Sequence, residues 1–428
     1  MAILLTGCLS SLRRRIIVSP PHLASDEKIG PGRPGLLRKV NVAEILRLVR
    51  QHGPCSRANL ARASGLSIPT VSSSIEYLQE KGLVEATGTR DSNGGRPPEL
   101  VRFNRSYGYV VGVDIGGSAV RLALADLDGT VIGRVNLAIH SRGTPAQVVT
   151  MIRGGVGQLQ KAHGIARKKL FAIALGAPGI TDLRAGIVRS APHLADWENV
   201  PLQRLVSENL GLATIIENDV NLGALGESWC GTARAVSDFV FIGIGTGVGA
   251  GVFLNGHLYH GTDWTAGEIG YLTVPGTRSG PLDMMQPGPL ESVIGGRGIE
   301  QAWCQANGGR RALRASEILD LADAGNPRAR SILERTARVL AEGILNLSVV
   351  LNPRLVVFGG RIGTHPVLFQ ATERIVQRSR LAAPRLAMSV LGQEAQLLGA
   401  VWLATQVAQA QLLGNAGAER ETNSVNAK

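Results

Sequence analysis

The sequence predicts two structural units, an N-terminal helical domain with a small β-wing and a larger α/β domain that follows it. Helical segments within residues 36–81 are followed by two strand-like segments around a polar loop. From Tyr109 onward, short β-branched runs alternate with glycine-rich turns and helical stretches, a pattern typical of α/β proteins. A chain of 428 residues is also too long for one ordinary hydrophobic core.

Composition indicates a globular protein outside the membrane. Hydrophobic residues make up 44% of the chain and charged residues 18%, and no run reaches the roughly 18 apolar residues of a membrane-spanning helix. The four cysteines are scattered without a Cys-x-x-Cys pair, which argues against a disulfide framework and against a four-cysteine zinc site. We therefore expect a cytoplasmic protein with no membrane partner.

Positive charge is concentrated near the N-terminus. Residues 1–105 contain 16 Lys and Arg against 8 Asp and Glu, whereas the remaining 323 residues contain 29 against 25. An excess confined to one quarter of the chain favours a polyanion-binding module, although a basic solvated tail would give the same count.

Residues 36–81 have the pattern of a helix-turn-helix. Val40, Ile45, Leu46 and Val49 recur at helical spacing until Gly53-Pro54 ends the run. Ser56 is then expected to cap a second short helix that Gly65 closes, and Ser67 to cap a third helix over Ile68–Lys81.

The third helix is the predicted recognition helix. Val71, Ile75 and Leu78 would pack inward and leave a row of hydroxyl side chains for the major groove of double-stranded DNA. The predicted DNA-contacting hydroxyl residues are Ser67, Thr70, Ser72, Ser73 and Ser74.

Two strands, Leu83–Ala86 and Leu100–Phe103, would form the wing. The loop between them contains Asn-Gly-Gly-Arg-Pro-Pro, and Arg96 in this loop suits insertion into a narrow A·T minor groove. The same residues also suit a stiff connector between domains.

The α/β region contains polar clusters at the ends of predicted strands. Val110–Ser118 is a strand that runs into an Asp-x-Gly-Gly turn, and a Gly-Thr-Gly-x-Gly loop follows the strand Phe239–Gly243. Between them, the buried strand that begins at Ile215 ends in Glu-Asn-Asp-x-Asn, which opens a helix. A carboxylate beside bare glycine amides suits a phosphate site.

These motifs, in this order, resemble the ROK family (repressor, open reading frame, kinase), in its repressor branch that includes the xylose repressors. The resemblance runs from about Leu36 to Ala404 and includes the Gly-Gly-Arg-Pro wing. It implies an actin-like, sugar-kinase-type fold of two α/β lobes with a sugar cleft between them. It also implies a homodimer or homotetramer, which suits a palindromic operator.

The resemblance also implies roles for individual residues. Those that match ATP-phosphate contacts are Asp114, Gly116, Gly117, Ser118, Gly245, Thr246 and Gly247. Asp219 matches the catalytic base of the family's kinases, and Asn218, Glu268 and Glu291 match residues that hydrogen-bond the sugar. Predicted sugar contacts also include Tyr271 and His193, although a surface loop explains His193 equally well.

The zinc site of the family is not expected here. Where its members have Glu-x-Gly-His, this chain has Glu268-Ile269-Gly270-Tyr271, and the stretch 275–289 lacks the family's cysteines entirely. A tetrahedral zinc site therefore has no ligands, and we predict no metal and no bound cofactor. ATP with Mg²⁺ would apply only to an active kinase.

The leading hypothesis is a sugar-responsive DNA-binding regulator of carbohydrate genes, with release from DNA as the expected response. One alternative is an ATP-dependent sugar kinase of the ROK type, and another is a regulator controlled by a protein partner. The expected division of the chain is a disordered extension (1–35), a winged helix-turn-helix (36–105), a first lobe (106–235), a second lobe (236–385), a C-terminal helix packing on the first lobe (386–410) and a disordered tail (411–428).

Overall fold

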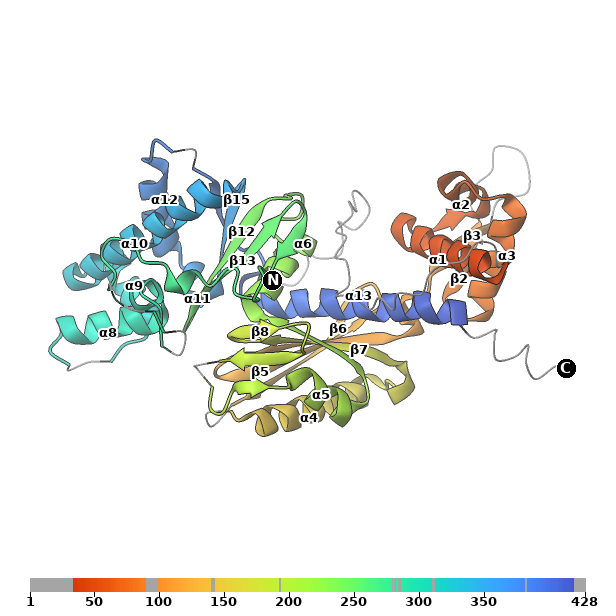
Figure 1. Cartoon of the computed structure of the whole chain (residues 1–428), viewed down its shortest axis with the longest axis horizontal. Coiled ribbons are helices and arrows are strands. Elements are labelled where there is room, and N and C mark those ends of the chain that lie inside the picture. Colours follow the sequence, from red (N-terminus) through yellow and green to blue (C-terminus); the bar gives the residue numbers. More distant parts are fainter. Residues whose placement is uncertain are drawn as a thin grey trace.

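The computed structural model describes residues 34–89, 99–139, 143–191, 194–278, 280, 282–283, 286–309, 312–381 and 383–418. They form an N-terminal domain and two α/β lobes, and one long C-terminal helix reaches from the lobes to the N-terminal domain (Figure 1). None of the helices in these ranges is long and apolar enough to cross a membrane.

The N-terminal domain packs three helices on an antiparallel sheet of order β1-β3-β2. Ser56 caps the second helix by accepting a hydrogen bond from the Asn59 amide, and Gly65 ends it with a left-handed φ of 71°. Ser67 caps the third helix through the Thr70 amide, so the predicted helix-turn-helix is confirmed. The elements are α1 (Pro34–His52), β1 (Cys55–Ser56), α2 (Arg57–Ser64), α3 (Ile68–Glu80), β2 (Val84–Thr89) and β3 (Glu99–Phe103).

The first lobe is built on a five-stranded sheet of order β11-β7-β4-β5-β6, in which β11, β7 and β4 are parallel. Helices α4 and α5 pack against this sheet, and a small sheet of order β10-β9-β8 lies beside it. The elements are β4 (Tyr109–Ile115), β5 (Ala119–Asp126), β6 (Val131–Ala138), α4 (Pro145–His163), β7 (Leu170–Ala177), β8 (Ile180–Asp182), β9 (Ile187–Ser190), β10 (Glu198–Val200), α5 (Leu202–Leu210) and β11 (Ala213–Asn218).

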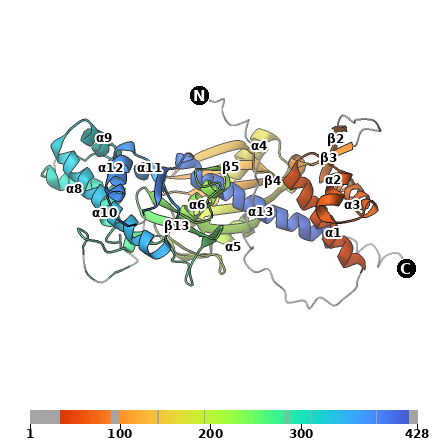
Figure 2. The ribbon, with the colours of Figure 1, turned by 90° about the horizontal axis from the view of Figure 1, so that it is seen from above.

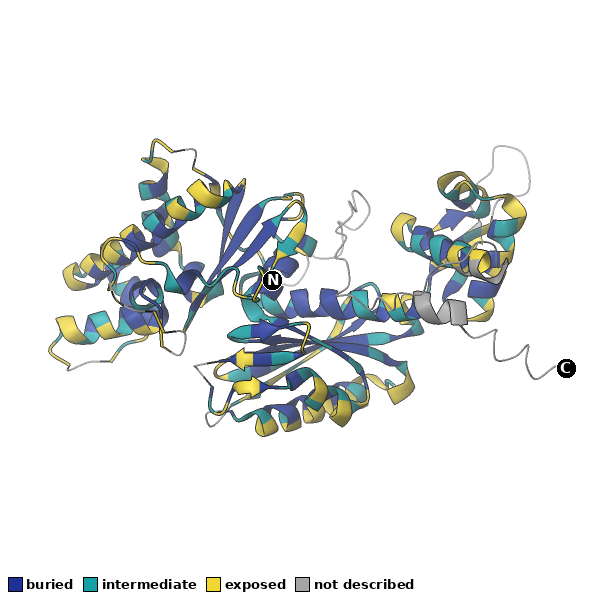
Figure 3. Ribbon diagram, viewed as in Figure 1, coloured by how far each residue is buried: buried dark blue, intermediate teal, exposed yellow. Residues whose placement is uncertain are grey.

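The second lobe repeats this plan with a sheet of order β14-β13-β12-β15-β16. Its sheet is buried, whereas the outer faces of its helices are exposed (Figure 3). The elements are α6 (Asp219–Cys230), β12 (Phe239–Ile244), β13 (Val248–Leu254), β14 (His257–Tyr259), α7 (Glu291–Ile294), α8 (Gly296–Ala306), α9 (Ala315–Asp323), α10 (Pro327–Leu351), β15 (Leu355–Gly359), α11 (Gly360–Gly363), α12 (Pro366–Gln377) and β16 (Arg385–Met388). Short 3₁₀ turns are η1 (Arg105–Tyr107), η2 (Arg167–Lys169), η3 (Ile269–Tyr271) and η4 (Gly392–Glu394).

Helices α6 and α13 (Ala395–Ala418) connect the parts of the molecule. Helix α6 packs on both β12 and β13 of the second lobe and on α13, and α13 packs on β4 and β7 of the first lobe. The two helices meet at glycines: a Cβ on Gly399 would lie 1.9 Å from the Leu222 carbonyl oxygen, and one on Gly226 would lie 2.2 Å from that of Ala395.

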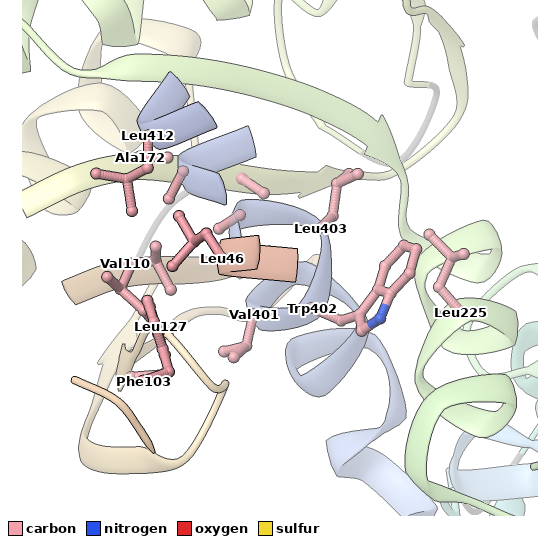
Figure 4. Packing of buried hydrophobic residues seen from close by; sticks show 14 of the residues in the cluster. Leu46, Phe103, Val110, Leu127, Ala172, Leu225, Val401, Trp402, Leu403 and Leu412 are labelled. Atoms are coloured by element: carbon pink, nitrogen blue, oxygen red, sulfur yellow. The ribbon is translucent and has the colours of Figure 1, made fainter. Parts of the chain in front are cut away.

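The far part of α13 packs against α1, so the N-terminal domain shares a core with the first lobe. Two perpendicular views place α13 beside the first-lobe sheet and reaching α1 (Figures 1 and 2). In the close view, Leu46 of α1, Val110 of β4 and Val401 of α13 belong to one buried cluster (Figure 4). Helix α13 therefore links the two lobes to the N-terminal domain.

The C-terminal region differs from the expected helix over 386–410. Residues Arg385–Met388 form β16, which pairs in parallel with β15, so the second lobe continues past residue 385. The helix begins only at Ala395 and continues to Ala418, beyond the expected start of a tail at 411. Apolar Leu412 explains the extension, because its side chain is buried in the core shared with α1.

Candidate functional site

Helix α3 presents a mixed polar face away from its own core. Val71, Ile75 and Leu78 are completely buried. Ser73 is exposed, and Thr70 and Ser72 are half-buried. Two of these hydroxyls already have partners: that of Ser73 donates to the Thr70 carbonyl at 3.1 Å, and that of Thr70 lies 2.8 Å from the Ser67 hydroxyl. Ser67 is exposed too, but its hydroxyl already accepts a hydrogen bond from the Thr70 amide at 3.3 Å.

Ser74 does not belong to this face, and the prediction that it contacts DNA is wrong. Its side chain is 3% exposed, and its hydroxyl donates a hydrogen bond to the Thr70 carbonyl at 2.8 Å. The reason is helical geometry, because a residue three positions after Val71 lies on the same, inward face.

Ile68 was missed by the sequence analysis. It is the first residue of α3, and its side chain is 50% exposed. The first residues of a recognition helix contact base edges, and an apolar side chain there can pack on a thymine methyl group. Ile68 lies three residues before Val71 and continues the spacing of Val71, Ile75 and Leu78, so the pattern predicts a buried side chain and its exposure had no signal in the sequence. Arg96 of the predicted wing loop lies outside the described residues.

A second polar cluster lies where the parallel strands of the first lobe end. Strand β11 ends at Asn218, whose side-chain amide donates to the Gly179 carbonyl at 2.9 Å and whose oxygen caps α6. Asp219 follows as the first residue of α6. The pairing of β11 with β7 and of β7 with β4 brings Asp114, at the end of β4, to the same edge.

Carboxylates from both lobes interact in this cluster. Burial, the charge of Asp114 and the charge of Glu268 together raise the pKa of Asp219 to about 7. Burial and the charge of Glu291 raise the pKa of Glu268 to about 7. The structure therefore brings together Asp114, Asp219, Glu268 and Glu291, which sequence motifs more than 170 residues apart had predicted.

Glu291 and Tyr271 form the second-lobe side of the cluster. The carboxylate of Glu291 accepts a hydrogen bond from the Val248 amide at 2.8 Å, which ties α7 to the strand after the Gly245–Gly247 loop. The Tyr271 hydroxyl donates to the Gln286 carbonyl at 3.0 Å. Burial and the charges of Glu268, Glu291 and Asp283 raise the pKa of Tyr271 to about 12, so this phenol stays neutral and keeps the proton that it donates to Gln286.

A hydrogen-bond network behind Asn218 was not predicted. Glu217 is 2% exposed, and its Oε1 accepts from the Asn218 amide at 2.8 Å and from the Asn221 side chain at 3.0 Å. Its Oε2 bonds His260 Nε2 at 2.8 Å across 43 residues of sequence. His260 thus holds the carboxylate that orients the predicted sugar-binding segment.

The two glycine loops border open space. A Cβ added to Gly117 or to Gly245 would meet no atom within 4 Å, so a ligand can approach the backbone closely at both positions. In the second loop, the Gly245 amide donates to the Gly247 carbonyl at 2.9 Å, and Thr246 at the tip is exposed. In the first loop, the Ser118 carbonyl accepts a hydrogen bond from the Ile139 amide at 2.9 Å.

Asp114 is already paired. Its Oδ2 accepts two hydrogen bonds from Arg121, at 2.8 and 2.5 Å. The same guanidinium donates to the Gln393 carbonyl at 2.6 Å, in the turn that precedes α13. This pairing reduces the suitability of Asp114 as a ligand for a metal–phosphate group.

The described residues contain no group of three or more His, Cys, Asp or Glu side chains arranged to hold a metal ion. The stretch 275–289 also has no Cys or His in its sequence, so a family-type zinc site does not fit this chain. His193, a predicted sugar contact, lies outside the part of the chain that the structure describes.

The fold and the clusters define a protein that joins a winged helix-turn-helix to a two-lobed domain of sugar-kinase type. Residues 110–407 match the ROK family, and residues 43–85 match the winged helix-turn-helix DNA-binding family. The chain belongs to the ROK family.

Curated and solved relatives include both regulators and kinases. The xylose repressor of Bacillus subtilis is 29% identical, with 85% of this chain and 94% of the repressor covered. The glucokinase of Halalkalibacterium halodurans is 28% identical, with 72% of this chain and 98% of the glucokinase covered. A crystallised ROK family transcriptional regulator, a homologue of the E. coli MLC protein, superposes with a TM-score of 0.73 at 23% identity, covering 89% of this chain and 99% of the regulator.

Proposed function

We propose that this protein is a transcriptional repressor that holds an operator with α3 and the wing and releases it when a sugar binds near Asn218 and Asp219. The observation that carries the proposal is helix α13, which packs on the sheet of the first lobe and on α1 of the DNA-binding domain. The names of the relatives support this function, since both a xylose repressor and the N-acetylglucosamine repressor of Escherichia coli are similar over nearly their whole length.

The proposed signal is closure of the two lobes. Asn218 and Asp219 belong to the junction of the first lobe with α6, whereas Glu268 and Glu291 follow strands of the second lobe. A sugar that bonds both pairs draws the lobes together. Because α13 follows β16 of the second lobe directly, this closure shifts α13 and with it α1.

The test is an operator-binding assay with the full-length protein. DNA ligands are selected from random duplexes, and fluorescence anisotropy is followed during titration with xylose, glucose and N-acetylglucosamine. We expect one sugar to weaken operator binding at least about tenfold, which corresponds to a coupling of about 1.4 kcal/mol. Asp219→Asn should abolish the response while leaving affinity for the operator in sugar-free buffer unchanged. Unaltered affinity with all three sugars contradicts the proposed response to them and favours a protein partner.

Assembly and location follow from this function. A palindromic operator needs two copies of α3, so the proposed state is a homodimer or homotetramer. Its chromosomal partner places the protein in the cytoplasm. The proposed sugar site works without a metal or a nucleotide.

The second candidate function is an ATP-dependent sugar kinase, and Asp219 is the observation that favours it. A buried carboxylate with a pKa of about 7, at the start of α6, suits a general base for a sugar hydroxyl. In such an enzyme, ATP would supply the transferred phosphoryl group, and the backbone of the Gly245–Gly247 loop would lie against its phosphates. A coupled assay for ADP release with the same sugars tests this, and a signal that disappears in Asp219→Asn establishes the kinase.

A further inference from the structure

A series of charged contacts leads from the predicted sugar site to the turn before α13. It begins at Asp219, which lies close enough to Asp114 for the charge of Asp114 to raise its pKa. Asp114 is in turn paired with Arg121, its cross-strand neighbour on β5. The last contact reaches η4, where the Gln393 carbonyl accepts a hydrogen bond from Arg121 at 2.6 Å.

Arg121 holds partners on two sides at once. Its Nε and Nη2 donate to Oδ2 of Asp114, at 2.8 and 2.5 Å, whereas its Nη1 donates to Gln393 and lies 3.8 Å from Oε1 of Glu394. A guanidinium is planar and its donors are fixed in direction, so one side chain sets the geometry between its partners. Asp114 is buried and Arg121 is mostly buried, so solvent screens this pair weakly.

The turn that Arg121 holds belongs to the hinge segment, residues 389–394, which connects β16 of the second lobe with α13. This segment is also bound to the end of α6. The Val390 amide donates to the Thr232 hydroxyl at 3.1 Å, and the Ser389 hydroxyl donates to the buried carboxylate of Glu227. The hinge segment is thus fastened to α6 on one side and, through the guanidinium, to the sheet of the first lobe on the other.

We propose that Arg121 is the positioning residue that transmits sugar binding to α13. A sugar bound at Asp219 changes the surroundings of Asp114, and closure of the lobes moves the hinge segment relative to the first lobe. Arg121 joins the two events because it is bonded to Asp114 and to the hinge segment together. This inference rests on the proposed function, and it assigns the coupling to a residue outside the proposed sugar and DNA contacts.

The experiment compares the full-length wild type with Arg121→Lys. Lysine keeps a positive charge beside the buried Asp114, but its single ammonium group cannot hold Asp114 and the hinge segment in the same fixed geometry. Isothermal titration with xylose, glucose and N-acetylglucosamine gives the affinity for each sugar. Fluorescence anisotropy with the selected operator then gives operator affinity with and without the sugar that binds most tightly.

The expected change is a loss of coupling with both binding sites intact. Saturating sugar should weaken operator binding at least about tenfold in the wild type and less than about threefold in Arg121→Lys. Sugar affinity without operator, and operator affinity without sugar, should each stay within about threefold of the wild type.

Arg189→Lys is the matched control. Arg189 also pairs with a buried carboxylate of the first lobe, that of Asp182, but on the small sheet of β8 and β9 rather than at the hinge segment. The same substitution there should leave the response of operator binding to sugar at its wild-type value.

Hydrogen exchange provides a second readout that needs no DNA. The tightest sugar should change the exchange rates of amides in residues 389–400 in the wild type and in Arg189→Lys, but not in Arg121→Lys. A residue that only stabilised the fold would instead raise exchange in these amides equally with and without sugar.

The outcomes separate this inference from the proposed function. A full response retained in Arg121→Lys overturns the inference, and so does an equal loss of response in Arg189→Lys or a loss of sugar binding itself in Arg121→Lys. A wild type whose operator affinity changes with none of the sugars contradicts the proposed function instead. In that case, the exchange measurement still decides whether Arg121 connects the sugar site to the hinge segment.

Discussion

At the scale of single residues, the site is a set of carboxylates that cannot all be charged at once. Asp219 and Glu268 each have a pKa of about 7, because burial and a neighbouring carboxylate disfavour their charged forms. In the protonated form, each can donate a hydrogen bond to a sugar oxygen, and in the charged form each can accept one from a hydroxyl. At neutral pH, both the protonated and the charged forms of these carboxyl groups are thus available to hydrogen-bond a sugar.

These shifts predict a pH-dependent stability. In the unfolded chain, carboxyl groups titrate near pH 4, so between about pH 4 and 7 the folded state holds more protons than the unfolded state. The free energy of unfolding therefore falls as pH rises through this window. Asp219→Asn removes one such group and should exceed the wild type in stability at pH 8 by about 1–3 kcal/mol, with a smaller difference at pH 4.

Thermal unfolding at pH 4, 6 and 8 measures this difference. Asp263→Asn, at an exposed position, is the control and should follow the wild-type profile. Parallel profiles for wild type and Asp219→Asn would show that the pKa of Asp219 is not raised in the folded protein.

Motifs predicted the residues at strand ends but not the partners that hold them. The segment from Glu217 to Asn221 stands out in the sequence, because a buried strand ends in consecutive polar residues. His260 and Arg121 do not stand out, since each acts through a pairing that only the folded chain creates. The prediction for Ser74 was wrong for the opposite reason. Its hydroxyl suited a contact with DNA, but its position on the helix turns it inward, where it is buried.

At the scale of elements, α13 is the least predictable part and the most consequential. Its apolar residues are spread around the helix rather than confined to one stripe, because α6, four strands of the first lobe and α1 all pack against it. Its N-terminal boundary was misplaced because Arg385–Met388 is too short a strand to recognise outside its sheet. The caps of α2 and α3, in contrast, depend on neighbouring residues only and were predicted correctly.

The close contact of α13 with α6 predicts that one added methyl group lowers the stability of the protein. Gly399→Ala places a Cβ 1.9 Å from the Leu222 carbonyl oxygen, so the two helices must separate. We expect a loss of about 1–3 kcal/mol in the free energy of unfolding. Gly157→Ala on α4 is the matched control: its Cβ meets nothing within 4 Å, and it should stabilise the protein by about 0.5–1 kcal/mol. Equal urea midpoints for the two variants would show that α13 and α6 do not pack this closely.

At the scale of the whole molecule, the N-terminal domain, α6 and α13 share one continuous hydrophobic core. The cluster that contains Leu46 of α1 and Phe103 of the wing also contains Leu225 of α6 and Trp402 of α13 (Figure 4). A two-domain protein with a flexible linker would keep such residues in separate cores. Here, a change in the packing of α6 reaches the DNA-binding domain through side chains in direct contact.

This continuity predicts reciprocal coupling between operator and effector. If the effector weakens operator binding by a given factor, the operator must weaken effector binding by the same factor, because both paths around the cycle have equal free energy. Titrating the effector into the full-length protein with and without saturating operator, and the operator with and without effector, measures both factors. We expect them to agree, and we expect operator affinity to fall steeply with salt because phosphate contacts release counterions. Effector binding that leaves operator affinity unchanged would mean that the shared core transmits no free energy between the sites, and the effector would then act without releasing DNA.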